Sequence, residues 1–165
     1  MKYAILKILF ALLLIILLSF FWKLSRPVEI VAIHYMNSSA YILVRNFPIT
    51  INRKIAWWQE NRPMLEKKYG LPALDYDGMQ RMSFWNFAQG YQTEKPRDDT
   101  FFPSQDTSYL LCFDDMQVKE NCIVKDRQMD MGKTRDGLVL FYFANKVFIE
   151  RPDGEVVRGK DLLQR

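Results

Sequence analysis

The residues that could do chemistry are few, and the first to consider is a pair of cysteines. Cys112 and Cys122 are the only two in the 165-residue chain. An even pair at short separation is typical of a disulfide in an oxidising compartment, although two unrelated thiols in a reduced domain are the alternative. If two antiparallel strands pair with Cys112 opposite Cys122, Asp115 lies opposite Lys119. We therefore predict a disulfide across a hairpin and a domain outside the cytoplasm.

The sequence specifies no catalytic, cofactor or metal site. Its only histidine, His34, ends a predicted strand, where a buried, hydrogen-bonded histidine is more ordinary than a catalytic base. One histidine and two cysteines supply no zinc set without carboxylates. Gly132-Lys133-Thr134 lacks the earlier glycine of a phosphate-binding loop, because Arg127 stands in its place, and is expected in a surface turn. Asp75-x-Asp77-Gly78 lacks the spacing of a calcium loop. We expect a protein that is not an enzyme.

Two acidic pairs remain to be placed. Asp114 and Asp115 are neighbours, and we expect them to be solvated at a hairpin tip. Residues 92–106 lack regular periodicity, and a loop of this length is usually functional or disordered. It carries charges that could orient a basic partner and aromatic side chains of the kind enriched at interfaces, which are Asp98, Asp99, Phe101 and Phe102. We predict a partner-binding surface there; alternatively, the phenylalanines belong to the core or the loop has no role.

The positive charge belongs to the N-terminal segment. The chain has 23 basic and 19 acidic residues and a net charge of +4. The only charged residues before Glu29 are four cations, Lys2, Lys7, Lys23 and Arg26. The rest of the chain is therefore neutral. This balance removes the electrostatic attraction that nucleic-acid binding requires.

The N-terminal segment also predicts a membrane anchor. Residues 8–22 contain no charge, and a helix over about 3–22 spans about 30 Å at 1.5 Å per residue, provided that Lys7 bends toward the headgroups. A secretory signal peptide is the alternative, but no small-x-small pair of the kind that signal peptidase cleaves follows the apolar run. Phe20, Phe21 and Trp22 instead suit an interfacial aromatic belt. We expect residues 1–25 to anchor the chain in a lipid bilayer and residues 26–165 to form one globular domain.

The remaining pattern predicts an α+β fold. Apolar residues recur at helical spacing over 51–69, where Pro63 should produce a kink or divide the segment into two short helices. This helix is locally basic, and its cations should lie on a solvated face over a core centred on Trp58; they are Arg53, Lys54, Arg62, Lys67 and Lys68. Contact of the helix with anionic headgroups, with Trp57 at the interface, is the alternative. The Leu138–Phe143 segment is apolar on both faces and should be a central strand. Strands are expected at 28–34, 40–46, 79–87, 107–113, 122–128, 138–143, 146–151 and 155–158, mainly antiparallel and packed against the one kinked helix.

Several stretches together resemble a family of small, uncharacterised enterobacterial membrane proteins. They include Arg26-Pro27-Val28-Glu29-Ile30-Val31, Val44-Arg45-Asn46-Phe47-Pro48, Phe84-Trp85-Asn86-Phe87 and Leu111-Cys112-Phe113-Asp114-Asp115. The resemblance implies an inner-membrane anchor and a periplasmic domain in a Gram-negative bacterium. It implies no activity. The stretch near 92–106 has no counterpart in that family. The slight excess of positive charge before the anchor and the cysteine pair predict a cytoplasmic N-terminus.

Three functions are compatible with these features. The first is a periplasmic protein-binding domain, for example an immunity protein against an envelope-acting toxin. The second is an accessory or structural subunit of an envelope complex, which should expose a broad apolar patch. The third is a hydrolase with an unrecognised site, which should hold carboxylates of perturbed pKa in a pocket.

Overall fold

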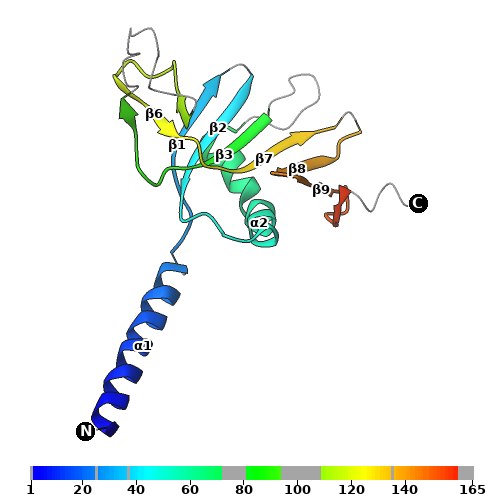
Figure 1. Ribbon diagram of the computed structural model, residues 1–165. Helices are drawn as coiled ribbons and strands as arrows, with labels where there is room; N and C mark the ends of the chain where they lie inside the picture. The colour runs from blue at the N-terminus through cyan, green and yellow to red at the C-terminus, as the bar shows by residue number, and fades with distance from the viewer. Residues whose placement is uncertain are drawn as a thin grey trace.

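The computed structural model describes residues 2–24, 26–36, 38–71, 81–93, 109–134 and 136–159. An N-terminal helix, α1 (Lys2–Leu24), projects away from a domain that the described residues after it form (Figure 1). Within the described residues, no helix is both long enough and apolar enough to cross a membrane. The membrane span predicted over residues 3–22 is therefore not confirmed.

The domain is built on a seven-stranded sheet. Its strands, in spatial order, are β1 (Glu29–Met36), β2 (Ser39–Arg45), β3 (Arg81–Asn86), β7 (Arg127–Lys133), β8 (Val139–Phe143), β9 (Lys146–Glu150) and β10 (Val156–Arg158). All neighbours are antiparallel except β2 and β3, which are parallel. Helix α2 (Ile51–Tyr69) connects these two, as a parallel pair requires a crossover. The fold is α+β, and the predicted β1–β2 hairpin is confirmed.

Helix α2 is a single element that contains Pro63, so the alternative of two short helices is wrong. It ends at Gly70, whose φ of 58° is the left-handed conformation common after helices. Its apolar face carries Ile55, Trp58 and Leu65, all buried in one core cluster with Phe84 of β3 and Phe141 of β8. The predicted core around Trp58 is confirmed.

Lys54 is not on a solvated face as predicted. Its residue is only 8% exposed, and Nζ donates hydrogen bonds to the backbone oxygen and the side-chain Oε1 of Gln128, at 3.1 and 2.9 Å. Burial lowers the pKa of Lys54, while the nearby carboxylate of Asp126 opposes that shift. This lysine therefore connects α2 to β7.

Strand β7 was not predicted, although it lies in the middle of the sheet. The sequence indicated one strand over 122–128 and a turn at Gly132-Lys133-Thr134; in the structure Gly132 and Lys133 belong to β7. Met129 and Met131 alternate inward and are both buried, the period expected of a strand with one buried face. Methionine has no strong preference for strands, which explains why this signal was missed.

Strand β8 is interior but not central, and it is not buried on both faces as predicted. Phe141 and Phe143 are buried, whereas Tyr142 between them is 40% exposed. The strand that is buried on both faces is β2, where Ile42, Leu43 and Val44 are all inaccessible to solvent. This difference follows from a second layer that covers only part of the main sheet.

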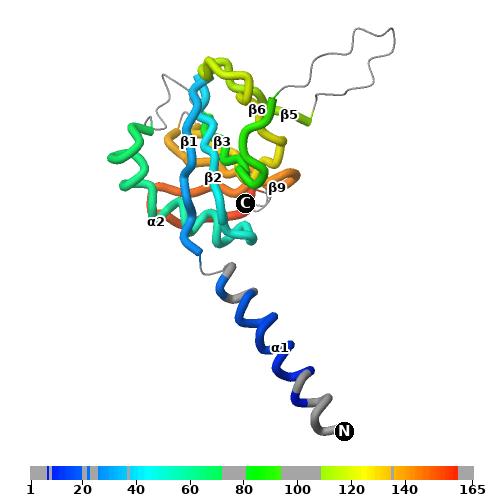
Figure 2. The backbone as a smooth tube through the Cα atoms, turned by 90° about the vertical axis from the view of Figure 1, so that its left-hand side faces the viewer, coloured from blue at the N-terminus to red at the C-terminus, as the bar shows by residue number. Residues whose placement is uncertain are grey.

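That layer is a three-stranded sheet with the order β4 (Gln92–Thr93), β6 (Glu120–Val124) and β5 (Leu110–Cys112). Gln92 and Thr93 thus form a strand, contrary to the loop predicted from Gln92 onward. Phe113 and Ile123 pack with Leu43 of β2 in a second core cluster. Figure 2 shows α2 on one side of the main sheet, with β5 and β6 on the other. The domain therefore has three layers, which meet at β2.

Candidate functional site

The hairpin of β5 and β6 carries the predicted disulfide. Cys112 pairs with Cys122 in the antiparallel register, and the two sulfur atoms are bonded. Both the disulfide and the register inferred from the sequence are confirmed. The bond closes a turn in which the Phe113 amide donates to the backbone oxygen of Asn121 at 2.9 Å. The turn that follows is consequently held close to the end of the two strands.

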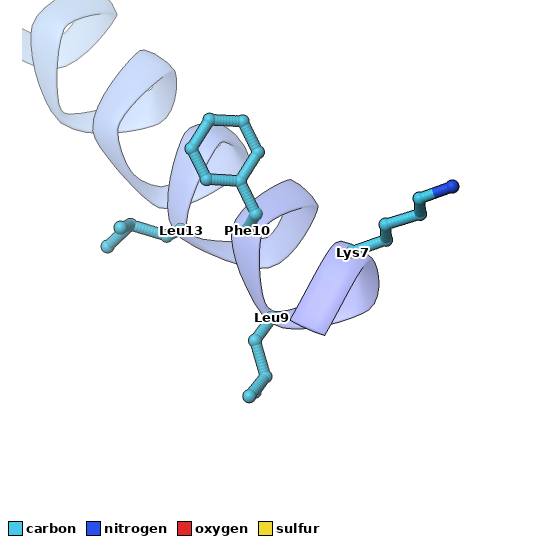
Figure 3. A pocket seen from close by; sticks show the side chains of 4 residues that line it. All are labelled: Lys7, Leu9, Phe10 and Leu13. Carbon is cyan, nitrogen blue, oxygen red and sulfur yellow. The ribbon is translucent and has the colours of Figure 1, made fainter. Parts of the chain in front are cut away.

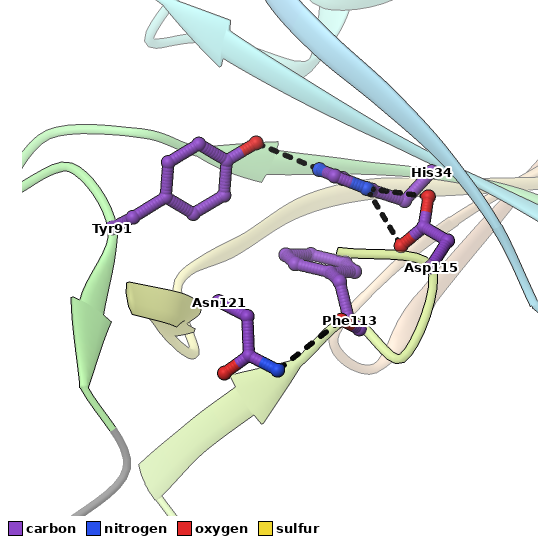
Figure 4. Close-up of polar contacts among 5 residues, drawn as sticks. All are labelled: His34, Tyr91, Phe113, Asp115 and Asn121. Carbon is purple, nitrogen blue, oxygen red and sulfur yellow. Dashed lines mark hydrogen bonds and ion pairs between the residues drawn. The ribbon is translucent and has the colours of Figure 1, made fainter. Parts of the chain in front are cut away.

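Asp115, in this turn, contacts His34 at the far end of β1 (Figure 4). The two carboxylate oxygens lie 3.0 and 2.9 Å from Nδ1 of His34. On the other side of the ring, Nε2 lies 2.7 Å from the hydroxyl oxygen of Tyr91, just before β4. The Phe113 ring stacks on the imidazole with centroids 3.9 Å apart and 15° between the planes. One histidine thus joins the main sheet to two segments of the small sheet; we call these four residues the His34 clasp.

The hydrogen bonds are complete with a neutral imidazole. Nδ1–H donates to Asp115, and the Tyr91 hydroxyl donates to Nε2, so both ring nitrogens have partners. His34 is 5% exposed, and an unpaired donor there would cost free energy. The predicted buried, hydrogen-bonded histidine at a strand end is confirmed. Asp114 and Asp115 are both exposed, as predicted, but Asp115 also binds His34, which the sequence did not indicate.

No signal in the sequence could have found the clasp. Asp115 is 81 residues from His34 and Tyr91 is 57 residues from it, and neither spacing has a local meaning. The carboxylate of Asp115 binds His34 instead of Lys119, the cross-strand partner suggested for it. Only the packing of one sheet on the other brings the three polar groups together.

The clasp resembles a hydrolytic triad in part, because a carboxylate orients a histidine whose other nitrogen meets a hydroxyl. Two features oppose that chemistry. Burial, and secondarily the charge of Asp115, raise the pKa of Tyr91, which keeps the phenol protonated and a poor nucleophile. Phe113 also covers one face of the imidazole. The arrangement is therefore suited to holding two sheets together.

No group of three metal-ligating side chains exists among the residues that the structure describes. A shallow hollow on α1 is lined by Lys7, Leu9, Phe10 and Leu13 (Figure 3). These side chains all come from one helix and point in different directions, so they do not converge on a common ligand.

The predicted partner-binding residues Asp98, Asp99, Phe101 and Phe102 lie outside the described residues.

A larger groove of about 990 Å³ lies between the start of β1, the connection from β2 to α2, and α2 itself. Its walls are largely apolar and include Phe47, Ile49, Trp57 and Met64. Arg26, Arg53 and Lys68 also line it. The sequence pointed to this helix face as basic, but it did not indicate a groove.

Comparison with known proteins gives one result. A family model described as enterobacterial putative membrane protein, a domain of unknown function, matches residues 2–160. The chain belongs to this family. The resemblance inferred from the sequence is confirmed, and it extends through the C-terminal strands. No curated protein and no solved structure matches the chain.

Replacing Asp115 with alanine should destabilise the domain. The change leaves the His34 Nδ1–H without its acceptor, and an unsatisfied buried donor costs about 1 to 3 kcal/mol. The free energy of unfolding can be measured by urea titration of the full chain in mild detergent. Asp114→Ala is the matched control, because it removes the adjacent, exposed carboxylate and should have an effect within about 0.5 kcal/mol. Equal losses in both variants would contradict the clasp.

The raised pKa of Tyr91 predicts weaker stability in alkali. Between the unfolded value near 10 and the higher folded value, the unfolded state loses a proton that the folded state retains, so the free energy of unfolding falls as pH rises. The effect should be small because the Tyr91 side chain is only partly buried. Unfolding from about pH 9 to 11 should show a shallower decline for Tyr91→Phe than for the wild type. Parallel declines would refute this assignment.

Proposed function

We propose that this protein is a single-pass inner-membrane protein whose periplasmic domain binds another protein without catalysis. The observation that carries the proposal is the state of His34. The chain's only histidine has both ring nitrogens bonded and one face covered, so it is committed to structure. The Cys112–Cys122 disulfide adds support for an oxidising compartment.

The anchoring part of the proposal rests on α1. This helix has 23 residues, and the large apolar side chains described on it are exposed, from Leu9 to Leu18 and at Trp22. It points away from the domain in both views (Figures 1 and 2). An exposed apolar helix needs a cover, and the family's description as a membrane protein favours lipid. Lys2 and Lys7 before the apolar run favour a cytoplasmic N-terminus.

The binding surface that we propose lies at the end of the domain away from α1. Strand β1 starts near the helix, and Tyr35 lies six residues after Glu29, or about 20 Å along the strand. Tyr35 is exposed there, as is Val118 in the turn that Asp115 holds against His34. Asp98, Asp99, Phe101 and Phe102 are proposed as further contacts. A domain tethered in this way would meet a toxin entering the envelope, so an immunity protein is the specific form proposed.

The alternatives differ in what they require. An accessory subunit of an envelope complex would also use an exposed surface, but its loss would impair the complex in every setting. A hydrolase is retained as a second candidate because of the Asp115–His34–Tyr91 arrangement. A hydrolase would need the Tyr91 hydroxyl for its activity, whereas a binding domain needs only that the two sheets stay packed together.

The topology can be tested with reporters fused after Arg165. Alkaline phosphatase folds only in the periplasm and should be active there, whereas green fluorescent protein at the same position should be dark. The physical reason is the charge bias before α1 together with the disulfide. A bright fluorescent fusion with an inactive phosphatase would reverse the orientation, and a fusion that washes off membranes at alkaline pH would exclude the anchor.

Competition between sibling strains tests the immunity form. A deletion strain should grow normally alone and lose viability beside its parent, because only the parent's toxin is then unopposed. The full chain should restore survival, Tyr91→Phe should do so equally, and Phe101→Ser/Phe102→Ser should do so poorly although it melts normally. A defect of the strain grown alone would favour the accessory subunit. Failure of Tyr91→Phe despite a normal melting temperature would favour the hydrolase.

A further inference from the structure

The groove at the base of the domain combines two kinds of lining. Aliphatic and aromatic side chains form the walls, and two of them are unusually open to solvent, Ile49 at 75% and Met64 at 42% exposure. Three cations, Arg26, Arg53 and Lys68, lie among them. No acidic residue is among the described residues that line the groove. A ligand that fits would have an apolar portion and a negative charge.

These cations are available for a ligand. Ion pairs in the described part of the chain use other basic residues, such as Arg62 with Glu66 on α2. Arg26 lies over the ring of Trp22, 4.6 Å from its centroid, and Lys68 lies over Tyr69 at 5.0 Å. Neither contact neutralises the charge. The groove therefore carries positive charge that no described ion pair neutralises, in a chain whose residues from Glu29 onward have no net charge.

The position of the groove next to α1 indicates which anionic ligand it would meet. Only one residue separates Leu24, the end of α1, from Arg26, and this connection covers at most about 7 Å. The headgroup layer is about 5 to 8 Å thick on each side of a bilayer. If α1 anchors the chain as proposed above, Arg26 lies at headgroup depth and the groove opens beside the membrane surface. Figure 1 shows this end of the domain, with the start of β1, next to α1.

We propose that the groove binds one anionic phospholipid of the membrane that holds α1. The phosphate is bound by Arg26, Arg53 and Lys68, and an acyl chain lies along Ile49, Trp57 and Met64. The groove volume of about 990 Å³ is at the upper end of the range for small-molecule sites. The bound lipid fixes the base of the domain on the membrane, so that its opposite end faces the periplasm. The lipid site rests on the proposed anchoring by α1.

Lipid retention by the intact protein tests the site. The full chain in mild detergent is equilibrated with vesicles of equal parts phosphatidylcholine and phosphatidylglycerol, and native mass spectrometry then counts bound lipids. The wild type should retain mainly phosphatidylglycerol. Arg53→Gln/Lys68→Gln should reduce that retention by about 30-fold, since each of the two cations near a headgroup contributes about 1 kcal/mol. Ile49→Ser/Met64→Ser should reduce retention of both lipids.

The matched control is Lys146→Gln/Arg158→Gln. It removes two exposed cations from β9 and β10, at the opposite edge of the main sheet from β1, and should leave retention unchanged. Melting temperatures of all variants exclude unfolding as the cause. Equal binding of the two lipids, equal loss in the control, displacement by inorganic phosphate alone, or a dimer without lipid would each overturn the site. The reporter fusions test the anchor separately, so failure of the anchor is distinguishable from failure of the lipid site.

Discussion

The burial of β2 on both faces is the constraint on which the rest of the domain depends. Ile42 and Val44 point into the core beneath α2, and Leu43 between them points into the core beneath the small sheet. Successive residues of a strand face opposite sides, so a shift of one residue would exchange the two cores. The connection through α2 then places β3 parallel to β2 and gives the main sheet its strand order. Helix α2 and the small sheet therefore pack on opposite faces of the same strand.

The small sheet needs more than apolar contact to stay in place. Its strands have two, three and five residues, which is short for an independent sheet. The disulfide joins β5 to β6, and the His34 clasp joins their turn and the segment before β4 to β1. These bonds are directional and so fix orientation, which apolar packing alone does less well. The same residues that suggest a triad thus have a sufficient structural role.

Charge is distributed according to position relative to α1. Near the helix, Arg26, Arg53 and Lys68 line an apolar groove, whereas the residues from Glu29 onward, Arg53 and Lys68 included, have no net charge. Lys54, one residue after Arg53, is instead turned inward and bonded to β7. Two neighbouring cations on one helix therefore differ in role, since one faces the core and the other the groove. This division distinguishes the end of the domain next to α1 from the opposite end, as the proposed tethered binding module requires.

The sequence by itself determined the features that depend on neighbouring residues. Apolar periodicity located α2 and its Trp58 face, and the β1–β2 hairpin followed from two β-branched runs. The short spacing of Cys112 and Cys122 indicated both their bond and the register of their strands. Charge counting predicted no nucleic-acid binding, and combined motifs identified the family. Each of these inferences uses interactions over a few residues or a property of the whole composition.

Only the tertiary structure decided what depends on distant segments. Methionine alternation in β7 was too weak a local signal, and its place in the middle of the sheet comes from pairing with β3 and β8. Asp115 and Tyr91 reach His34 because one sheet packs on another, and Lys54 is buried because β7 offers acceptors beside it. The groove likewise needs β1, the β2–α2 connection and α2 together. Contacts between residues far apart in the chain leave no spacing to read, because folding rather than local geometry sets their distance.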